Sequence, residues 1–361
     1  MENEKNSIFK SWEIGSKVNP LIIAGPCSAE SESQIMSIGT KLKTLGVNVF
    51  RAGIWKPRTR PNSFEGVGAI GLPWLKLLKQ ELGIKVAVEV ANAKHVHEAL
   101  KADVDILWIG ARTSVNPFSI QEIADSLKGT DVPILVKNPI NPDVDLWQGA
   151  IERIIGAGID KIAAVHRGFS SFNNTIYRNV PMWELPIELR RRMPDIPMIC
   201  DPSHIGGKRT MIQEISQKAM DLNYDGLMIE CHTDPDNAWS DAAQQVTPKR
   251  LIQIMKDLKI RDKTSEGEDY QNQLNNLRSQ IDVADQNLLT TLGKRMKVAK
   301  DIGKLKSDNN VAILQNKRWN EILGKMILDG EDHGLSEEFI LKFFKAIHQE
   351  SINNQKKILN K

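Results

Sequence analysis

Eight short apolar runs, separated by amphipathic segments, constrain the fold of this chain most strongly. Each run has the length of a strand and is rich in aliphatic or β-branched residues. The segments between them, such as Ser33 to Leu45 and Val144 to Ile155, carry apolar residues at helical spacing. This regular alternation of strand and helix is typical of a parallel βα array. The runs begin at Leu21, Val47, Lys85, Ile106, Pro133, Lys161, Pro197 and Gly226.

A chemically versatile side chain lies at or just beyond the carboxyl end of each run. Because a (β/α)8 barrel gathers all its strand ends at one mouth, it would bring these side chains together. A doubly wound open sheet would spread them along a line, and no G-x-G-x-x-G motif follows the first run. We therefore predict a (β/α)8 TIM barrel. The side chains are Cys27, Lys56, Glu89, Arg112, Lys137, Arg167, His204 and Glu230.

The stretch from Pro197 to Asp241 supplies an imidazole and two carboxylates, from His204, Glu230 and Asp241. Taken alone, Cys27 is more often a core thiol, but it would lie beside these groups in a closed barrel. One thiolate, one imidazole and two carboxylates suit a hard to borderline divalent cation such as Mn2+, Fe2+, Co2+ or Zn2+. The sequence therefore predicts a metal site formed by these four residues.

Five cations would meet at the same mouth. Each of them, taken singly, is more often a solvated loop charge. Together they would repel one another unless an anion lay among them. Phosphate and carboxylate are the expected guests, since arginine binds both with two parallel hydrogen bonds. The five are Arg51, Lys56, Arg112, Lys137 and Arg167.

Length and composition limit the remaining possibilities. A barrel of this type takes about 250 residues, which leaves about 100 of the 361 for a second domain. The 48 basic residues nearly balance the 45 acidic ones, which argues against a nucleic-acid-binding protein. Three cysteines and the lack of a run of membrane-spanning length favour a reducing cytoplasm, without export and without a membrane partner.

The C-terminal part reads as a separate all-α domain. The segment 260–269 is charged and nearly free of apolar residues, as linkers are. Beyond it we expect one long helix from Tyr270 to about Lys306 and two shorter ones, with a turn at Gly330 to Gly334. A helix of that length needs partner helices. The expected organisation is an N-terminal extension (1–19), the barrel (20–259), the linker (260–269) and three helices (270–361).

The motifs of the barrel resemble one enzyme family. They are R-A-G-I-W-K-P-R-T from Arg51, I-G-A-R, V-K-N, H-R-G, D-P-S-H, and E-C-H from Glu230. This part of the chain is similar to 3-deoxy-D-arabino-heptulosonate 7-phosphate (DAHP) synthase of the short-barrel subgroup. The resemblance implies condensation of phosphoenolpyruvate with erythrose 4-phosphate, the first step of the shikimate pathway.

The same resemblance assigns roles to residues. Cys27, His204, Glu230 and Asp241 would hold the metal, most often Mn2+, which polarises the aldehyde, and Lys56 would donate a proton to the alkoxide. Phosphoenolpyruvate would be bound by Arg51, Lys56, Glu89, Arg112, Lys137 and Arg167, and erythrose 4-phosphate by Arg58 and Thr59.

A related family, 3-deoxy-manno-octulosonate 8-phosphate synthase, shares the barrel and phosphoenolpyruvate but takes arabinose 5-phosphate. Its loop reads like K-A-N-R-S, whereas this chain has K-P-R-T at Lys56 to Thr59. The motif therefore favours the four-carbon sugar. Arg60 departs from the pattern, because the family often has a small Ser there.

The helical segment carries L-R-S-Q-I-D from Leu277, then Arg295, G-K-L-K ending at Lys306, Arg318, and S-I-N-N-Q from Ser351. With these motifs it resembles the all-helical class of chorismate mutase, which rearranges chorismate to prephenate. The resemblance implies that Arg278 reaches into the site of a partner chain, so that the protein is at least a homodimer. Gln315 and Trp319 depart from the pattern, since family members often carry Asp and Glu there near the substrate hydroxyl. Substrate-binding residues would be Arg278, Arg295, Lys306, Arg318, Ser351 and Gln355, with Lys306 and Gln355 catalytic at the ether oxygen.

Three hypotheses follow. The first is a bifunctional enzyme, synthase plus mutase, in which prephenate or chorismate bound to the helices also inhibits the barrel. The second makes the helices a non-catalytic module for dimerisation or regulation of the synthase. The third is a metal-binding or scaffold protein without catalytic activity, in which the cations at the mouth are structural.

Overall fold

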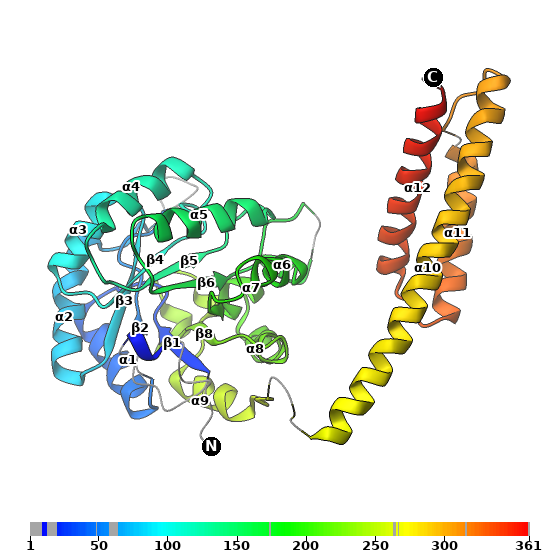
Figure 1. The fold of residues 1–361 in the computed structure, drawn as a ribbon. Helices are drawn as coiled ribbons and strands as arrows, with labels where there is room; N and C mark the ends of the chain where they lie inside the picture. The colour runs from blue at the N-terminus through cyan, green and yellow to red at the C-terminus, as the bar shows by residue number, and fades with distance from the viewer. Residues whose placement is uncertain are drawn as a thin grey trace. The chain divides into compact units, whose positions relative to one another are not determined.

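The computed structural model describes residues 9–12, 20–47, 49–57, 64–172, 175–262, 265, 267–314 and 316–359, without the side chains of 10, 316–318 and 359. It divides into two compact units, Met1–Lys263 and Thr264–Lys361, and each is described by itself (Figure 1). Parts of the predicted extension (1–19) and linker (260–269) lie outside the described residues. So do the predicted site residues Arg58 and Thr59, the side chain of the predicted site residue Arg318, and Gln315, which departs from the mutase pattern.

The first unit is a closed barrel of eight parallel strands, as predicted. Its ends meet where β1 pairs with β8, in a register that runs from Leu21 opposite Gly226 to Gly25 opposite Glu230. Every predicted apolar run forms one strand. The strands are β1 (Leu21–Gly25), β2 (Val49–Arg51), β3 (Lys85–Val90), β4 (Ile106–Ile109), β5 (Ile134–Lys137), β6 (Ile162–His166), β7 (Met198–Cys200) and β8 (Gly226–Glu230).

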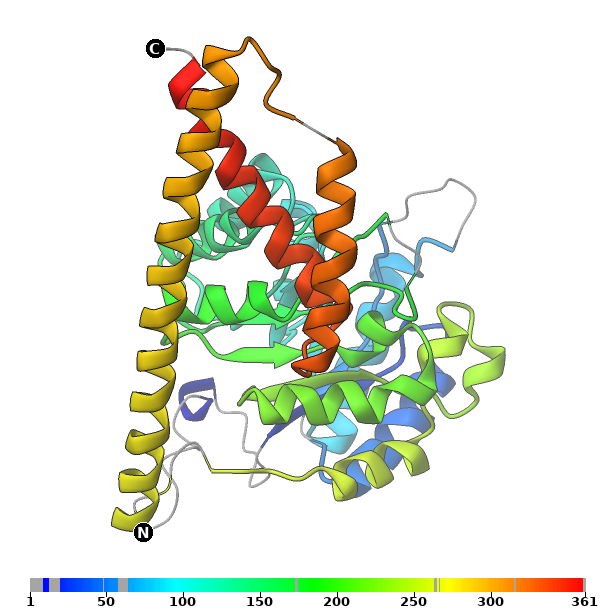
Figure 2. The same cartoon turned by 90° about the vertical axis from the view of Figure 1, so that its right-hand side faces the viewer.

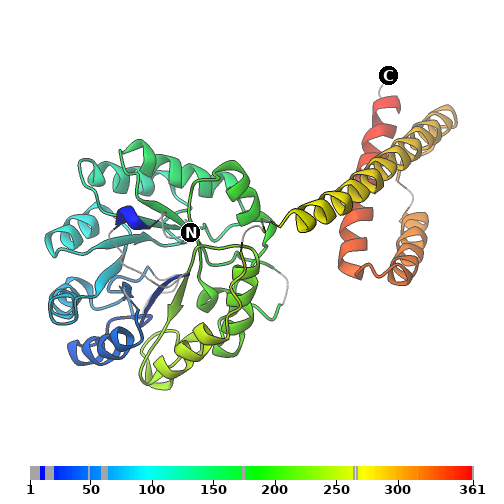
Figure 3. The same cartoon turned by 60° about the horizontal axis from the view of Figure 1, so that its bottom comes forward.

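Helices surround the strands (Figure 3). Several begin at side chains that cap their first backbone amides, namely Ser31, Asn92, Asn116, Asp143 and Thr247. The α-helices are α1 (Glu32–Thr44), α2 (Gly71–Leu82), α3 (Ala93–Lys101), α4 (Pro117–Leu127), α5 (Val144–Gly156), α6 (Glu184–Arg192), α7 (Pro202–Gly206), α8 (Ile212–Asp221) and α9 (Pro248–Asp257). Short 3-10 helices are η2 (Lys10–Trp12), η3 (Gly68–Ile70), η4 (Arg209–Met211), η5 (Pro235–Asn237) and η6 (Ala242–Gln244).

The apolar core has two layers because alternate strand residues face opposite sides. In β1, Ile22 and Ala24 pack outward against the helices, whereas Leu21 and Ile23 belong to the cluster inside the barrel. Trp108 of β4 belongs to the inner cluster as well. The interior is therefore filled by side chains, and chemistry is confined to the mouth.

The second unit consists of three helices, as predicted: α10 (Glu268–Asp308), α11 (Asn316–Asp332) and α12 (Glu337–Leu359). Helix α12 packs against both others (Figure 2). At Gly303 the backbones of α10 and α12 approach so closely that a Cβ would lie 3.1 Å from Cα of Gln355. Across the described parts of both units, no helix combines the length and the apolarity needed to cross a membrane.

Candidate active sites at the barrel mouth and in the helical unit

The barrel brings the described predicted residues to one mouth. Arg51, Lys137 and Glu230 are the last residues of β2, β5 and β8. Glu89 is the penultimate residue of β3, and His204 lies in the one-turn helix α7 after β7. Cys27, Arg112 and Arg167 follow β1, β4 and β6. Strand closure is therefore what makes these distant residues neighbours.

Cys27 is buried and lies at the centre of a polar cluster. Its Sγ is 3.1 Å from Oδ2 of Asp241 and 3.0 Å from Nζ of Lys56. Its backbone amide donates to Oε1 of Gln245 at 3.0 Å. Burial, together with the negative charge of Glu230, raises the pKa of the Cys27 thiol to about 12. A divalent cation at this point would favour the thiolate instead.

His204 is oriented by a buried carboxylate. Asp201 caps α7 by accepting from the His204 amide at 3.1 Å, and its Oδ2 lies 2.8 Å from Nδ1 of the same imidazole. The other ring nitrogen, Nε2, faces Oε1 of Glu230 at 3.8 Å. A metal-ligating histidine typically has this arrangement, with one nitrogen held by a carboxylate and the other presented to the ion.

Glu230 and Asp241 are both held in the ionised form. Burial alone would raise the pKa of Glu230, but His204 and Arg51 lower it, and Nη1 of Arg51 is 3.0 Å from its Oε1. Burial would likewise raise the pKa of Asp241, but Arg178 holds it well below its usual range across a 2.7 Å ion pair. Two ionised carboxylates are therefore in place before any cation binds.

The four candidate ligands fit a divalent ion by their chemistry. They form two pairs, Cys27 with Asp241 and His204 with Glu230. His204 also lowers the pKa of Asp241. Within the described residues, no three His, Cys, Asp or Glu side chains are gathered as a ready-made metal cluster. Instead, the donors bond to one another and to the cations around them, contacts that an ion would have to replace.

Trp108, which sequence reasoning missed, supports the cations from inside the barrel. The guanidinium carbon of Arg51 lies 4.8 Å from its ring centroid and Nζ of Lys137 lies 5.8 Å away, within reach of cation–π attraction. Its Nε1 donates to Oε2 of Glu89 at 3.0 Å. Gly110 leaves room for that carboxylate, since a Cβ there would lie 2.1 Å from Oε1.

Asp201 contacts both a candidate metal ligand, His204, and one of the basic side chains at the mouth, Lys137. Its Oδ2 contacts Nζ of Lys137 at 2.7 Å as well as the imidazole of His204. Burial would raise the pKa of Asp201, but His204 and Lys137 hold it well below the usual value. The one feature of the sequence that indicates this role is the position of Asp201 before Pro202 at the start of a helix.

Arg167 is the cation best placed to receive an anion. Within the described residues its guanidinium bonds to neutral oxygens, Oδ1 of Asn179 at 2.7 Å and the Gly168 carbonyl at 3.3 Å. Burial, together with the charges of Arg178 and Arg112, lowers its pKa to about 10. A buried guanidinium among other cations is a favourable phosphate or carboxylate site.

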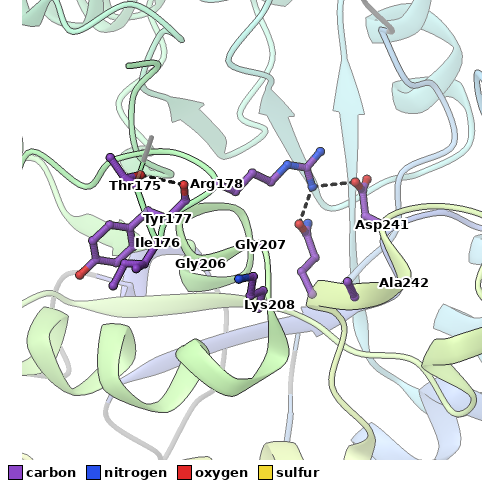
Figure 4. Close-up of a pocket in the computed structure, with 11 residues that line it drawn as sticks. Thr175, Ile176, Tyr177, Arg178, Gly206, Gly207, Lys208, Asp241 and Ala242 are labelled. Carbon is purple, nitrogen blue, oxygen red and sulfur yellow. Dashed lines mark hydrogen bonds and ion pairs between the residues drawn. The ribbon is translucent and has the colours of Figure 1, made fainter. Parts of the chain in front are cut away.

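A cavity of about 390 Å3 is lined in part by Asp241, one of the four candidate metal ligands. Arg178 extends across it toward Asp241, and its Nη1 also contacts Oε1 of Gln244 at 2.5 Å (Figure 4). Gln244 in turn donates to Oε2 of Glu230 at 2.6 Å. Sequence reasoning missed Arg178 and Gln244, because loop residues carry no periodicity that would indicate their neighbours.

In the helical unit, α10 and α12 bring three of the predicted residues together. Nη1 of Arg295 donates to Oγ of Ser351 at 2.6 Å, and the buried Gln355 lies one turn further along α12. Lys306 contacts the backbone carbonyl of Ile313. Arg278 is exposed and precedes Arg295 by 17 residues, or about 26 Å of helix, so one chain does not bring these two together.

The family model of the DAHP synthetase I family matches residues 3–266. The chain belongs to this family. A second family model, chorismate mutase type II, matches residues 277–356. This member of the DAHP synthetase I family therefore carries a synthase domain and a chorismate mutase domain in one chain.

The synthase domain is similar to curated proteins and to solved structures. Phospho-2-dehydro-3-deoxyheptonate aldolase of Thermotoga maritima is 33% identical over 240 residues, which cover 66% of this chain and 69% of the relative. 2-Dehydro-3-deoxyphosphooctonate aldolase of Desulfotalea psychrophila is 30% identical over 263 residues, which cover 67% and 89%. A crystal structure of the Thermotoga maritima DAHP synthase has a TM-score of 0.59 at 30% identity and covers 65% of this chain and 67% of that one.

Proposed function

We propose that the barrel condenses phosphoenolpyruvate with erythrose 4-phosphate to DAHP in a metal-dependent reaction of the shikimate pathway. The observation that carries this proposal is the meeting of the Cys27–Asp241 and His204–Glu230 pairs with Lys56 and Arg167 at one mouth. A metal-binding donor set beside an anion site is what an aldol-type reaction of a phosphorylated enol requires.

The proposed metal ligands are Cys27, His204, Glu230 and Asp241, and Mn2+ is the expected ion. When bound, a divalent ion polarises the aldehyde oxygen as a Lewis acid. C3 of the enol phosphate attacks the aldehyde carbon, and the developing alkoxide takes a proton from Lys56, whose Nζ already lies 3.0 Å from Cys27 Sγ. Water then adds at C2, and phosphate leaves with cleavage of its C–O bond.

The substrates are held by charge. Arg167, Arg112 and Lys137 are proposed to bind the phosphate and carboxylate of phosphoenolpyruvate, with Arg51 and Glu89 beside them. Lys137 is fixed by its 2.7 Å ion pair with Asp201, which supports this assignment. Arg58 and Thr59 are proposed to bind the phosphate of the aldose.

Incubation of the metal-stripped protein with phosphoenolpyruvate and each aldose phosphate tests the synthase proposal. We expect phosphate release with erythrose 4-phosphate, little release with arabinose 5-phosphate, and none with either sugar in EDTA. Added Mn2+ should restore the rate. Preference for arabinose 5-phosphate would assign the chain to the octulosonate reaction, which is the activity in the name of the Desulfotalea psychrophila relative. A rate unchanged by EDTA would contradict the metal role.

We also propose that the helical domain converts chorismate to prephenate. The Arg295–Ser351 pair is suited to a substrate carboxylate, and Oε1 of Gln355 is buried without a partner in the described residues. Gln355 and Lys306 would stabilise charge at the ether oxygen, and Arg318 would orient the substrate. Disappearance of chorismate absorbance with the full chain is the test. No loss of absorbance would favour the alternative, a non-catalytic dimerisation module.

Two further properties belong to this proposal. Exposed apolar residues on α10, among them Leu277, Ile281 and Leu288, support a homodimer through the helical domain, in which Arg278 enters the partner's site. Sedimentation at micromolar concentration should therefore show at least a dimer.

Prephenate or chorismate bound to the helical domain is proposed to inhibit the synthase, which requires the ligand to favour one global arrangement of the protein over another. Synthase rates that stay equal over a wide prephenate range would remove this regulation.

A further inference from the structure

His348 lies among the mutase residues, and the proposed chemistry gives it no part. It precedes Ser351 by three residues and Gln355 by seven on α12, so the three side chains project from the same face of the helix. Ser351 accepts from Arg295 at 2.6 Å, which places this face toward the cations of α10. His348 therefore belongs to the surroundings of the proposed chorismate site.

The imidazole of His348 is fixed by Trp319 of α11. The two rings are stacked, with centroids 4.0 Å apart and planes inclined by 17°. In this position Nε2 is buried and has no hydrogen-bond partner among the residues that the structure describes. Oε1 of Gln355, on the same face of α12, is a second buried polar atom in the same condition. Buried polar atoms without partners are costly, so this face is suited to a polar ligand.

The charges around His348 keep its ring neutral. Burial lowers the pKa of His348, and Arg295 and Lys306, both on α10, lower it further. Trp319, which packs on it from α11, is uncharged. A neutral imidazole offers one donor and one acceptor nitrogen, which suits a hydroxyl group, whereas Arg295 and Lys306 suit the anionic parts of a ligand.

We propose that His348 binds the ring hydroxyl of chorismate through Nε2 and so acts as a specificity-determining residue of the mutase site. Trp319 holds the imidazole by stacking, and Nε2 stays buried without a partner in the described residues. Because His348 and Gln355 lie on the same face of α12, Nε2 and the unpartnered Oε1 of Gln355 are available to the same ligand. The inference rests on the proposed mutase function and identifies which group contacts the hydroxyl.

The test compares chorismate with its methyl ether at the ring hydroxyl, using the full-length wild type and two variants. His348→Phe keeps a ring to stack on Trp319 but lacks the nitrogen, and His348→Gln keeps a polar group. We expect wild-type kcat/KM to fall about tenfold on methylation of the substrate, as loss of one hydrogen bond would cause. His348→Phe should lose about as much with chorismate and discriminate little between the two substrates. His348→Gln should recover part of both the rate and the preference.

His333→Phe, at an exposed histidine in the turn between α11 and α12, is the matched control and should behave as wild type. The proposal would be overturned if His348→Phe still preferred chorismate over the ether in kcat/KM as strongly as the wild type does. Wild-type activity of this variant with chorismate would also overturn it. Calorimetric titration with the same two compounds separates this inference from the mutase function. Suppose that the wild type does not turn chorismate over but binds it more tightly than the ether, and that His348→Phe loses this preference. That result would reject mutase activity and retain the hydroxyl contact. Absence of any preference would reject the contact.

Discussion

At the barrel mouth, functional side chains come from the ends of eight strands and are held by buried partners. At the helical site, they come from the facing surfaces of two packed helices, α10 and α12. Arg51 and Glu230 form an ion pair in which both side chains are almost inaccessible, at 2% and 0% exposure. In the helical unit, Arg278 is exposed, and Gln355 and His348 each have a buried polar atom without a partner in the described residues. Closure of the sheet organises the first site in one chain, whereas the second has buried polar atoms that a ligand could pair.

The largest expected effect is on the free energy of unfolding, when a buried ion pair at the barrel mouth is broken. Arg51→Met leaves Glu230 buried without its cation, and loss of one partner from a buried pair costs about 3–5 kcal/mol. Urea unfolding of the metal-free protein, followed by tryptophan fluorescence, measures the change. The matched control is Arg209→Met, whose partner Asp236 is 80% exposed, and it should cost less than about 1 kcal/mol. Equal losses in the two variants would show that the mouth is not organised by buried pairing.

The second prediction concerns Asp201, which orients both His204 and Lys137. Asp201→Asn should weaken Mn2+ binding about 10–100-fold, as loss of a partner that orients a metal ligand does. It should also raise the KM for phosphoenolpyruvate, because Lys137 loses its anchor. Asp131→Asn serves as the control, since Asp131 pairs with Lys161 at the opposite ends of the strands. Unchanged Mn2+ affinity in Asp201→Asn would contradict the link between the two halves of the mouth.

The third prediction concerns pH. Because burial raises the pKa of Cys27 to about 12, the thiol is protonated near neutrality, and an ion must displace its proton. Burial lowers the pKa of His204, which reduces competition from a proton on the imidazole. Between about pH 6 and 8, Mn2+ affinity should therefore rise about tenfold per pH unit, or ~1.4 kcal/mol. Calorimetry in two buffers should detect about one proton released per ion. Affinity independent of pH would show that Cys27 is not a ligand.

The smallest effect is expected at the helical site. Ser351→Ala removes the partner of Arg295, and the net value of such a bond is about 1 kcal/mol, or about fivefold in mutase kcat/KM. Thr290→Ala is the control, because Thr290 bonds to the backbone of its own helix on an exposed surface. A loss of more than about a hundredfold in Ser351→Ala would mean that this site is as tightly organised as the mouth.

Sequence reasoning recovered those features that depend on periodicity and strand ends. The eight strands and the three C-terminal helices were predicted from apolar spacing. Closure of the barrel was predicted from the functional side chains at the strand ends, and the convergence of Cys27 with Glu230 follows from that closure. Trp108 was missed because buried parallel strands are apolar on both faces, so the sequence does not indicate which residues point inward. Arg178 and the Trp319–His348 stack depend on loop conformation and on the register of one helix against another, which local patterns do not specify.

The most direct test of the central claim is a Mn2+ titration of the metal-stripped protein, with phosphate release from phosphoenolpyruvate and erythrose 4-phosphate as the readout. If Cys27, His204, Glu230 and Asp241 hold one catalytic ion beside the anion site, the rate should rise from near zero and level off at about one equivalent per chain. His204→Ala should abolish this rise while the mutase activity persists. A full rate in the stripped protein, or an unchanged titration in His204→Ala, would contradict the account.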